Sequence, residues 1–160
     1  MVERAIWCRR VLSASLFSDM ANPAQLTVLA RARQLSIDMH RAFQHIHSPV
    51  NPELKSQLLR AASSISRNIA EGSGRSTAAQ FSQFLGYAIG SANETEECLK
   101  QVNGVGLIAR ARYQAWLKEI SEIRMMTYGL RRYVERKPDG PDGHAERERT
   151  PPEPPPQSDL

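Results

Sequence analysis

Apolar residues recur at helical spacing in four separate stretches of the chain. The stretches are 23–46, 52–71, 77–102 and 109–136. In the first of them, the apolar positions three or four apart are Val28, Ala32, Leu35, Met39, Ala42 and Ile46. A period near 3.5 residues is typical of an amphipathic helix that buries one stripe, and no strand-like alternation competes with it. The pattern therefore predicts four helices and an all-α fold.

Residues that start or stop helices flank these stretches. Asn22 and Asn51 each precede a proline, which is a cap followed by a first-turn proline, and Thr77 with Gln80 forms a capping box. Gly72 is expected to end the second helix in the left-handed conformation that glycine adopts at little cost. Connections of about five residues favour antiparallel neighbours, so we predict an up-down-up-down four-helix bundle.

The bundle is expected to occupy residues 23–137, with different sequence on either side. Residues 138–160 hold seven of the ten prolines and six acidic against two basic residues, with few apolar side chains. Burial of so little apolar surface does not offset the entropy of ordering, which predicts a disordered acidic tail with polyproline II character. Residues 1–22 contain apolar residues interrupted by Arg9 and Arg10, which favours a weakly ordered extension over a secretory signal.

Composition excludes several classes of protein. The apolar runs are only a few residues long, whereas a membrane-spanning helix needs roughly 20. Cys8 and Cys98 cannot form a disulfide framework, so we expect a cytoplasmic protein. His40, His45 and His47 lack the spacing of helical metal ligands, and neither a G-x-S-x-G elbow nor a cysteine-histidine pair is visible. We therefore expect no enzymatic activity, metal or cofactor.

Positive charge is concentrated in the part predicted to fold. Residues 1–137 carry 19 Lys and Arg against 11 Asp and Glu, a net charge of +8, and arginine accounts for 17 of the 21 basic residues of the chain. Guanidinium groups suit phosphate, which indicates a nucleic-acid partner, whereas the lack of an aromatic stacking platform argues against sequence-specific recognition of single strands. The candidate nucleic-acid-binding residues are Arg31, Arg41, Lys55, Arg60, Arg67, Arg75, Arg131, Arg132, Arg136 and Lys137.

The most polar stretch of the chain lies at the end of the second predicted helix and contains Asn68, Glu71, Gly72, Gly74 and Arg75. A phosphate loop would place its glycines before a helix and after a strand, followed by Lys-Ser or Lys-Thr. Here the glycines follow a helix. We therefore favour a structural corner in which Asn68, Glu71 and Arg75 satisfy helix-end groups and neighbouring chains.

Gly86 and Gly90 lie inside the third predicted helix, where each glycine costs about 1 kcal/mol relative to alanine. Such a cost indicates close approach of another backbone, either from a neighbouring helix of the bundle or from a second subunit. Apolar residues outside the main stripes also need cover, which favours a homo-oligomer. These residues are Ile37, Phe43, Leu59, Phe84 and Ile89.

The sequence also resembles a known family. The residues that carry the resemblance are the run 60–75 with its Asn-Ile-Ala-Glu-Gly core, Phe81, Phe84, Leu85, Ala88, Gly90, Ser91, Glu94 and Gly106-Leu107-Ile108. They are similar to bacterial four-helix-bundle proteins encoded within intervening sequences of large-subunit ribosomal RNA genes, over about residues 26–134. Leu29 departs from the family, which often has tryptophan there, and both chain ends lie outside the pattern.

The resemblance implies relationship to the accessory variability determinant of diversity-generating retroelements. It further implies a homopentameric barrel whose basic surface contacts nucleic acid or a reverse transcriptase, without established catalytic activity. The expected function is therefore a non-enzymatic homo-oligomer that binds RNA or DNA non-specifically. The alternative is a protein-interaction scaffold that has no nucleic-acid partner and uses its arginines in subunit contacts.

Overall fold

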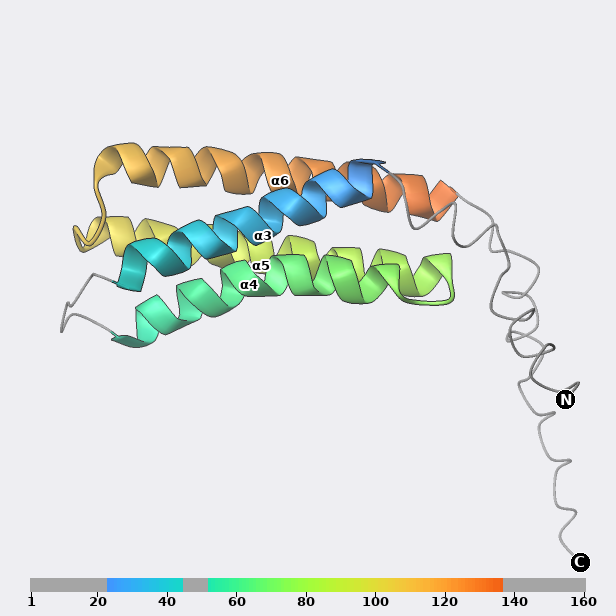
Figure 1. Ribbon diagram of the computed structural model, residues 1–160, viewed down its shortest axis with the longest axis horizontal. Helices are drawn as coiled ribbons and strands as arrows, with labels where there is room; N and C mark the ends of the chain where they lie inside the picture. Colours follow the sequence, from blue (N-terminus) through green and yellow to red (C-terminus); the bar gives the residue numbers. More distant parts are fainter. Residues whose placement is uncertain (1–22, 45–51, 137–160) are drawn as a thin grey trace, which may run out of the picture.

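Four α-helices make up the bundle (Figure 1). The computed structural model describes residues 23–44 and 52–136, in which no strand occurs and no helix has the length and apolar character needed to cross a membrane. The helices are α3 (Pro23–Gln44), α4 (Pro52–Ser73), α5 (Ala78–Gly104) and α6 (Arg110–Arg136). The predicted all-α class is confirmed. The ends of α4, α5 and α6 differ from the predicted ends by at most two residues.

Several sequence predictions fall outside the described residues. They concern the extension 1–22, the tail 138–160, the caps Asn22 and Asn51, and the last two residues of the predicted first helix.

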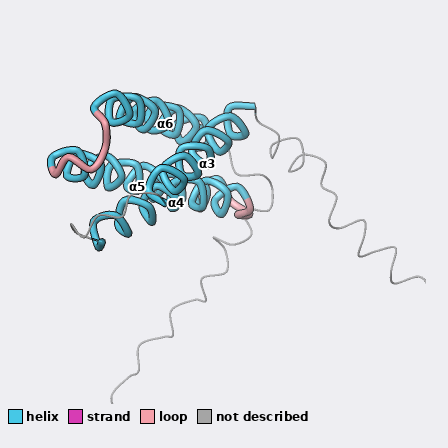
Figure 2. The backbone as a smooth tube through the Cα atoms, turned by 60° about the vertical axis from the view of Figure 1, so that its left-hand side comes forward, coloured by secondary structure: helices cyan, strands magenta, loops and turns pink. Residues whose placement is uncertain are grey.

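The helices form a closed ring of four neighbours. The backbones of α3 and α4, α4 and α5, α5 and α6, and α3 and α6 approach one another closely, whereas those of the diagonal pairs do not. Consecutive helices run in opposite directions, as the colours along the sequence show in Figure 1. The tube in Figure 2 places the α4–α5 and α5–α6 connections at opposite ends of the bundle. This is the predicted up-down-up-down arrangement.

The predicted apolar stripes meet along the axis of this ring. Phe43 on α3 stacks near Trp116 on α6, with ring centroids 6.1 Å apart. Of the residues outside the stripes, Phe43 and Ile89 are buried and two others are half-buried, so Ile37 alone among them is exposed, at 37%. The bundle itself therefore covers most of the apolar surface that the sequence suggested a second subunit would cover. The largest fully buried side chains are Phe43, Met39, Leu58, Ile65, Ile69, Leu85, Leu99, Ile120 and Ile123.

The two ends of α5 follow from local hydrogen bonding. Thr77 precedes the helix in an extended conformation, and its hydroxyl accepts a hydrogen bond from the Gln80 amide at 3.2 Å, which is the predicted cap. At the other end, the Val105 amide donates to the Gln101 carbonyl at 3.1 Å. Gly106 follows with a φ of 73°, a conformation that glycine adopts readily.

Gly72 does not end α4 in the predicted left-handed conformation. The helix continues to Ser73, and Gly106 is the positive-φ glycine among the described residues. Gly72 is instead buried against the start of α5. A Cβ atom at this position would lie 2.6 Å from the Phe84 Cβ and 2.8 Å from the Phe81 Cδ2. Close packing of α4 on α5, rather than backbone conformation, therefore requires a glycine here.

Among residues 23–44 and 52–136, no backbone lies close to Gly86 or Gly90 as the first of the two sequence alternatives required. A Cβ at Gly86 would meet the Arg131 side chain at 3.6 Å, and a Cβ at Gly90 would have nothing within 4 Å. Approach of a neighbouring helix of the same bundle is therefore wrong for both positions. Approach of a second subunit stays a prediction.

Candidate nucleic-acid interface

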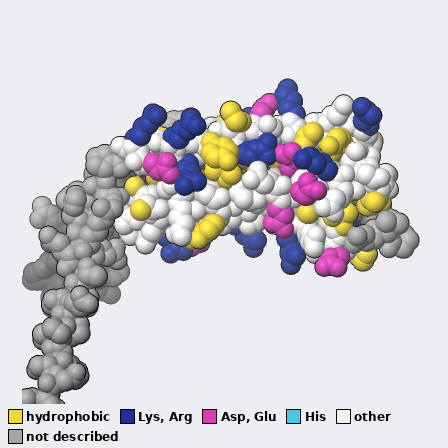
Figure 3. Space-filling view, turned by 180° about the vertical axis from the view of Figure 1, so that it is seen from behind, with side chains coloured by type: hydrophobic (Ala, Val, Ile, Leu, Met, Phe, Trp, Pro, Cys, Tyr) yellow, Lys and Arg dark blue, Asp and Glu magenta, His cyan; other side chains and the backbone are white. Residues whose placement is uncertain are grey.

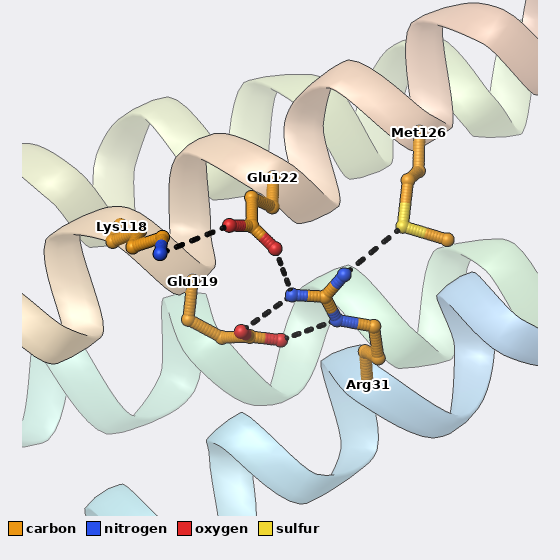
Figure 4. A network of polar contacts seen from close by, with 5 residues as sticks. All are labelled: Arg31, Lys118, Glu119, Glu122 and Met126. Carbon is orange, nitrogen blue, oxygen red and sulfur yellow. Dashed lines mark hydrogen bonds and ion pairs between the residues drawn. The ribbon is translucent and has the colours of Figure 1, made fainter.

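Arg31, one of the candidate nucleic-acid-binding residues, is paired with carboxylates of the same chain (Figure 4). Its Nε and Nη2 donate to the two carboxylate oxygens of Glu119 at 2.7 and 2.6 Å, and Nη2 also bonds to Glu122. Its Nη1 lies 3.6 Å from the Met126 sulfur. The hydrogen bonds to Glu119 and Glu122 raise the pKa of Arg31 above its ordinary value. Arg31 joins α3 to α6, and the carboxylates of Glu119 and Glu122 offset its charge.

Two more of the predicted cations are paired on the chain surface. Arg75 forms an ion pair with Glu71 and lies over the Phe84 ring, 4.7 Å from the centroid. Arg131 Nε donates to Glu135 at 2.9 Å and to the Ser82 hydroxyl at 3.2 Å. A neighbouring carboxylate therefore offsets the positive charge of each arginine, Glu71 for Arg75 and Glu135 for Arg131.

Lys55 serves the end of the preceding helix. Its Nζ donates to the Phe43 carbonyl at 2.6 Å, one residue before the last residue of α3. A cation at a helix C-terminus satisfies an unpaired carbonyl and complements the helix dipole.

The remaining predicted cations divide into two groups at different places. Arg41 and the pair Arg60 and Arg67 lie on α3 and α4, and Arg132 and Arg136 lie on the last turns of α6. All five are exposed and make no ion pair within the described part of the chain. Lys137 lies outside the described residues.

Two members of the first group, Arg60 and Arg67, lie near the line where α3 and α4 meet. The Ser36 and Ser63 hydroxyls are 2.9 Å apart across this line. Arg60 and Arg67 flank Ser63, three residues before it and four after it, and therefore lie on the same side of α4. On α3, Arg33 precedes Ser36 by three residues, which in an antiparallel pair sets it level with the turn that contains Arg67.

We call Arg33, Arg41, Arg60 and Arg67 the α3–α4 basic face. Arg33 is exposed and makes no ion pair among the described residues, yet it was missing from the sequence prediction. The sequence does contain a signal for Arg33. Around the axis of α3, Arg31 and Arg33 lie at equal angles on either side of Arg41, so the pattern does not favour one of them over the other. Helix packing distinguishes them: Glu119 and Glu122 on α6 pair with Arg31, whereas Arg33 has no ion pair among the described residues.

The opposite side of the bundle has a different character. Its α5 helix contains one lysine against three glutamates, a net charge of −2. Glu96 on α5 bonds to Lys100 at 2.9 Å and to Arg124 on α6 at 2.5 Å, and these two bonds lower its pKa. Figure 3, seen from behind, shows hydrophobic side chains interspersed with charges of both signs. Phosphate chains therefore meet a less favourable field at α5 than at the α3–α4 basic face.

The polar stretch at the end of α4 forms a corner. The Asn68 amide donates to the hydroxyls of Ser64 and, on α5, Ser91 at 3.1 and 3.4 Å. The Gly74 amide donates to the Glu71 carbonyl at 3.2 Å. The amides and carbonyls of this segment thus satisfy one another and the adjacent helix, and the corner joins α4 to α5.

Comparison with known proteins places this bundle in a family. Residues 24–129 match the model of the family described as 23S rRNA-intervening sequence protein. A crystal structure of a protein with unknown function from the S23 ribosomal protein family of Bacteroides thetaiotaomicron has a TM-score of 0.63 at 22% identity, covering 68% of this chain and 98% of that chain. At that identity the likeness shows a common fold.

No curated protein matches the sequence. The family match covers more than half of the chain, includes all four helices in whole or in large part, and contains the Asn68 corner. The chain therefore belongs to the 23S rRNA-intervening sequence protein family.

Proposed function

We propose that this protein is a non-enzymatic, cytoplasmic homo-oligomer that binds RNA or DNA non-specifically through the α3–α4 basic face. The observation that carries the proposal is the set of four exposed arginines beside the Ser36–Ser63 contact, none of them ion-paired within the described residues. Unpaired guanidinium groups attract phosphate strongly because no carboxylate has to be displaced. The face carries no exposed aromatic residue, so recognition is by backbone charge rather than base stacking.

The family name suggests the biological setting. A protein associated with a 23S rRNA intervening sequence meets structured RNA, and the backbone of a folded RNA presents phosphate without requiring splayed bases. We accordingly propose RNA as the principal ligand. A role beside a reverse transcriptase is part of the same proposal, since the resemblance to retroelement accessory proteins implies it.

A salt titration with matched variants tests this function. The affinity of the wild-type protein for a labelled RNA hairpin and for duplex DNA should fall linearly with salt on log-log axes. The triple variant R33Q/R60Q/R67Q should bind at least about tenfold more weakly at low salt and have a slope reduced by about 2 to 3, because each phosphate contact contributes roughly 0.9.

R31Q is the control variant, because Arg31 is neutralised by Glu119 and Glu122. It should retain wild-type affinity and slope. Affinity that is insensitive to salt, or unchanged in the triple variant, would contradict the proposed face.

The second candidate function is a protein-interaction scaffold, and one observation favours it. Tyr87, Met125 and Tyr128 on α5 and α6 are 52%, 68% and 42% exposed. Tyrosine, methionine and arginine are enriched in protein interfaces. Loss of partner or subunit binding in Y128A, with full RNA affinity retained, would assign this surface to protein contacts and leave both functions in one molecule.

A further inference from the structure

We propose that the acidic C-terminal segment, residues 138–160, binds the α3–α4 basic face of the bundle and competes there with nucleic acid. The competition rests on the function proposed above. The contact between the segment and the face does not depend on that function, because both the segment and the face belong to this chain.

Charge complementarity is the first argument. The segment carries six carboxylates and two arginines, a net charge of −4. The α3–α4 basic face carries four arginines that the described residues leave without a carboxylate. Carboxylates accept the same forked hydrogen bonds from guanidinium groups as phosphate does, so segment and nucleic acid present one chemistry to one surface.

The position of the segment is the second argument. It follows α6, whose last described residue is Arg136. Arg131 contacts Ser82, which places the end of α6 beside the start of α5, and Gly72 packs on Phe84, which places the end of α4 there too. The last residue of α6 therefore lies at the end of the bundle where α4 finishes, and the segment follows it in the sequence (Figure 1).

Reach does not limit the contact. A 27-residue helix such as α6 is about 40 Å long at about 1.5 Å per residue. The 23 residues of the segment can extend to about 75 Å. Its carboxylates can thus meet every arginine of the face. Covalent attachment raises their effective concentration to about the millimolar range, so weak ion pairs are enough.

Other surfaces of the bundle fit the segment less well. On α5, Glu94 and Glu97 are exposed and repel it. On α6, Arg124 and Arg131 already pair with Glu96 and Glu135. Arg110, Arg112, Arg132 and Arg136 on α6 are free of such pairs within the described residues. Arg132 and Arg136 are nearest to the segment in sequence and are the competing location that the experiment has to separate.

The contact is tested without nucleic acid. The receptor is the full chain with its own carboxylates neutralised (D139N, D142N, E146Q, E148Q, E153Q and D159N), and the probe is a fluorescent peptide of residues 138–160. Anisotropy should report salt-sensitive binding that R33Q/R60Q/R67Q weakens roughly fivefold or more, whereas R132Q/R136Q should have a smaller effect. Circular dichroism confirms that each variant is folded. Absence of peptide binding, or loss only in R132Q/R136Q, would overturn the contact.

The competition is tested by measuring the affinity of four proteins for the RNA hairpin. They are the wild type, the chain with its segment carboxylates neutralised, R33Q/R60Q/R67Q, and the chain that combines both sets of substitutions. Neutralising the segment should strengthen binding by roughly fivefold at low salt in the otherwise wild-type chain, and should have no effect in the R33Q/R60Q/R67Q background. An equal gain in both backgrounds would mean that the segment acts through overall charge and not at this face.

If none of the four proteins bound RNA, the proposed function and the competition would both be wrong. The peptide titration would still decide whether the segment binds the face.

Discussion

Gly72 and Gly129 both lie in helices, but only Gly72 lies against another helix. At Gly72 a Cβ would overlap Phe84 and Phe81, and at Gly129 it would have nothing within 4 Å. The overlap with Phe84 involves its Cβ, which rotation of the side chain cannot move. One methyl group at Gly72 therefore requires α4 and α5 to separate.

We expect Gly72→Ala to destabilise the protein by about 1 to 3 kcal/mol, because overpacking outweighs the helix propensity that alanine adds. Gly129→Ala is the matched control and should stabilise by up to about 1 kcal/mol. Urea denaturation of both variants measures the difference. A Gly72→Ala variant as stable as wild type would show that the two helices separate easily.

Arg31 and Arg33 are two residues apart and have opposite roles. Arg31→Gln should lower the free energy of unfolding by about 1 kcal/mol, since it removes a forked ion pair between α3 and α6. Arg33→Gln should change stability by less than about 0.5 kcal/mol and weaken RNA binding instead. Denaturation and RNA titration of both variants check this. A double-mutant cycle of Arg31 with Glu119 should recover most of the stability loss as coupling.

At the scale of elements, ion pairs link α6 to both of its neighbours. Hydrogen bonds from Lys100 and Arg124 lower the pKa of Glu96, the bond from Arg31 lowers that of Glu122, and bonds from Ser82 and then Arg131 lower that of Glu135. Carboxylates whose pKa is lower in the folded state stabilise the protein above their unfolded pKa. That contribution is lost as pH falls through the folded value.

The thermal midpoint should therefore be flat near neutral pH and fall as pH drops below the ordinary carboxylate pKa of 4.5. Glu96→Gln should have a lower midpoint at pH 7 and a smaller fall on acidification, because the group that titrates is gone. Calorimetry of both proteins from about pH 7 to about pH 3 measures this. Parallel curves for wild type and Glu96→Gln would mean that other groups control the acid response.

For the whole molecule, assembly is the open prediction. The bundle buries most of its own apolar side chains, and the exposed ones that remain include Tyr87, Met125 and Tyr128 on α5 and α6. Gly86 and Gly90 lie on α5 close to this surface, and no backbone of another described helix lies close to them. A second subunit packed on α5 and α6 would explain why glycine occurs at both positions.

Light scattering should therefore report a mass several times the 17.9 kDa of one chain, with a ring of five as the specific expectation. A Cβ at Gly90 meets nothing within 4 Å among the described residues, so Gly90→Leu should keep the helix content measured by circular dichroism but reduce the mass. A monomeric wild type, or a Gly90→Leu variant that keeps the wild-type mass, would contradict the predicted subunit contact through α5 and α6.

The sequence by itself determined the helices, because the 3.5-residue period of apolar side chains and the residues at helix ends are local properties of the chain. Thr77 caps α5 as predicted, and the stripe of α6 is buried as predicted. The same local reasoning identified the arginines as a class. It could not distinguish ion-paired from unpaired arginines, since pairing depends on which carboxylates of a neighbouring helix lie within reach.

Tertiary structure distinguished residues that have equivalent positions in the local sequence pattern. Arg31 and Arg33 occupy equivalent flanks of α3, but helix packing sets Arg31 beside Glu119 on α6 and leaves Arg33 exposed, without an ion pair among the described residues. Gly72 and Gly90 are both glycines in helices, but only at Gly72 would a Cβ overlap side chains of another helix, those of Phe84 and Phe81. In each case the determining contact joins residues far apart in the chain, and a contact of that kind depends on helix packing, which the local pattern of residues does not contain.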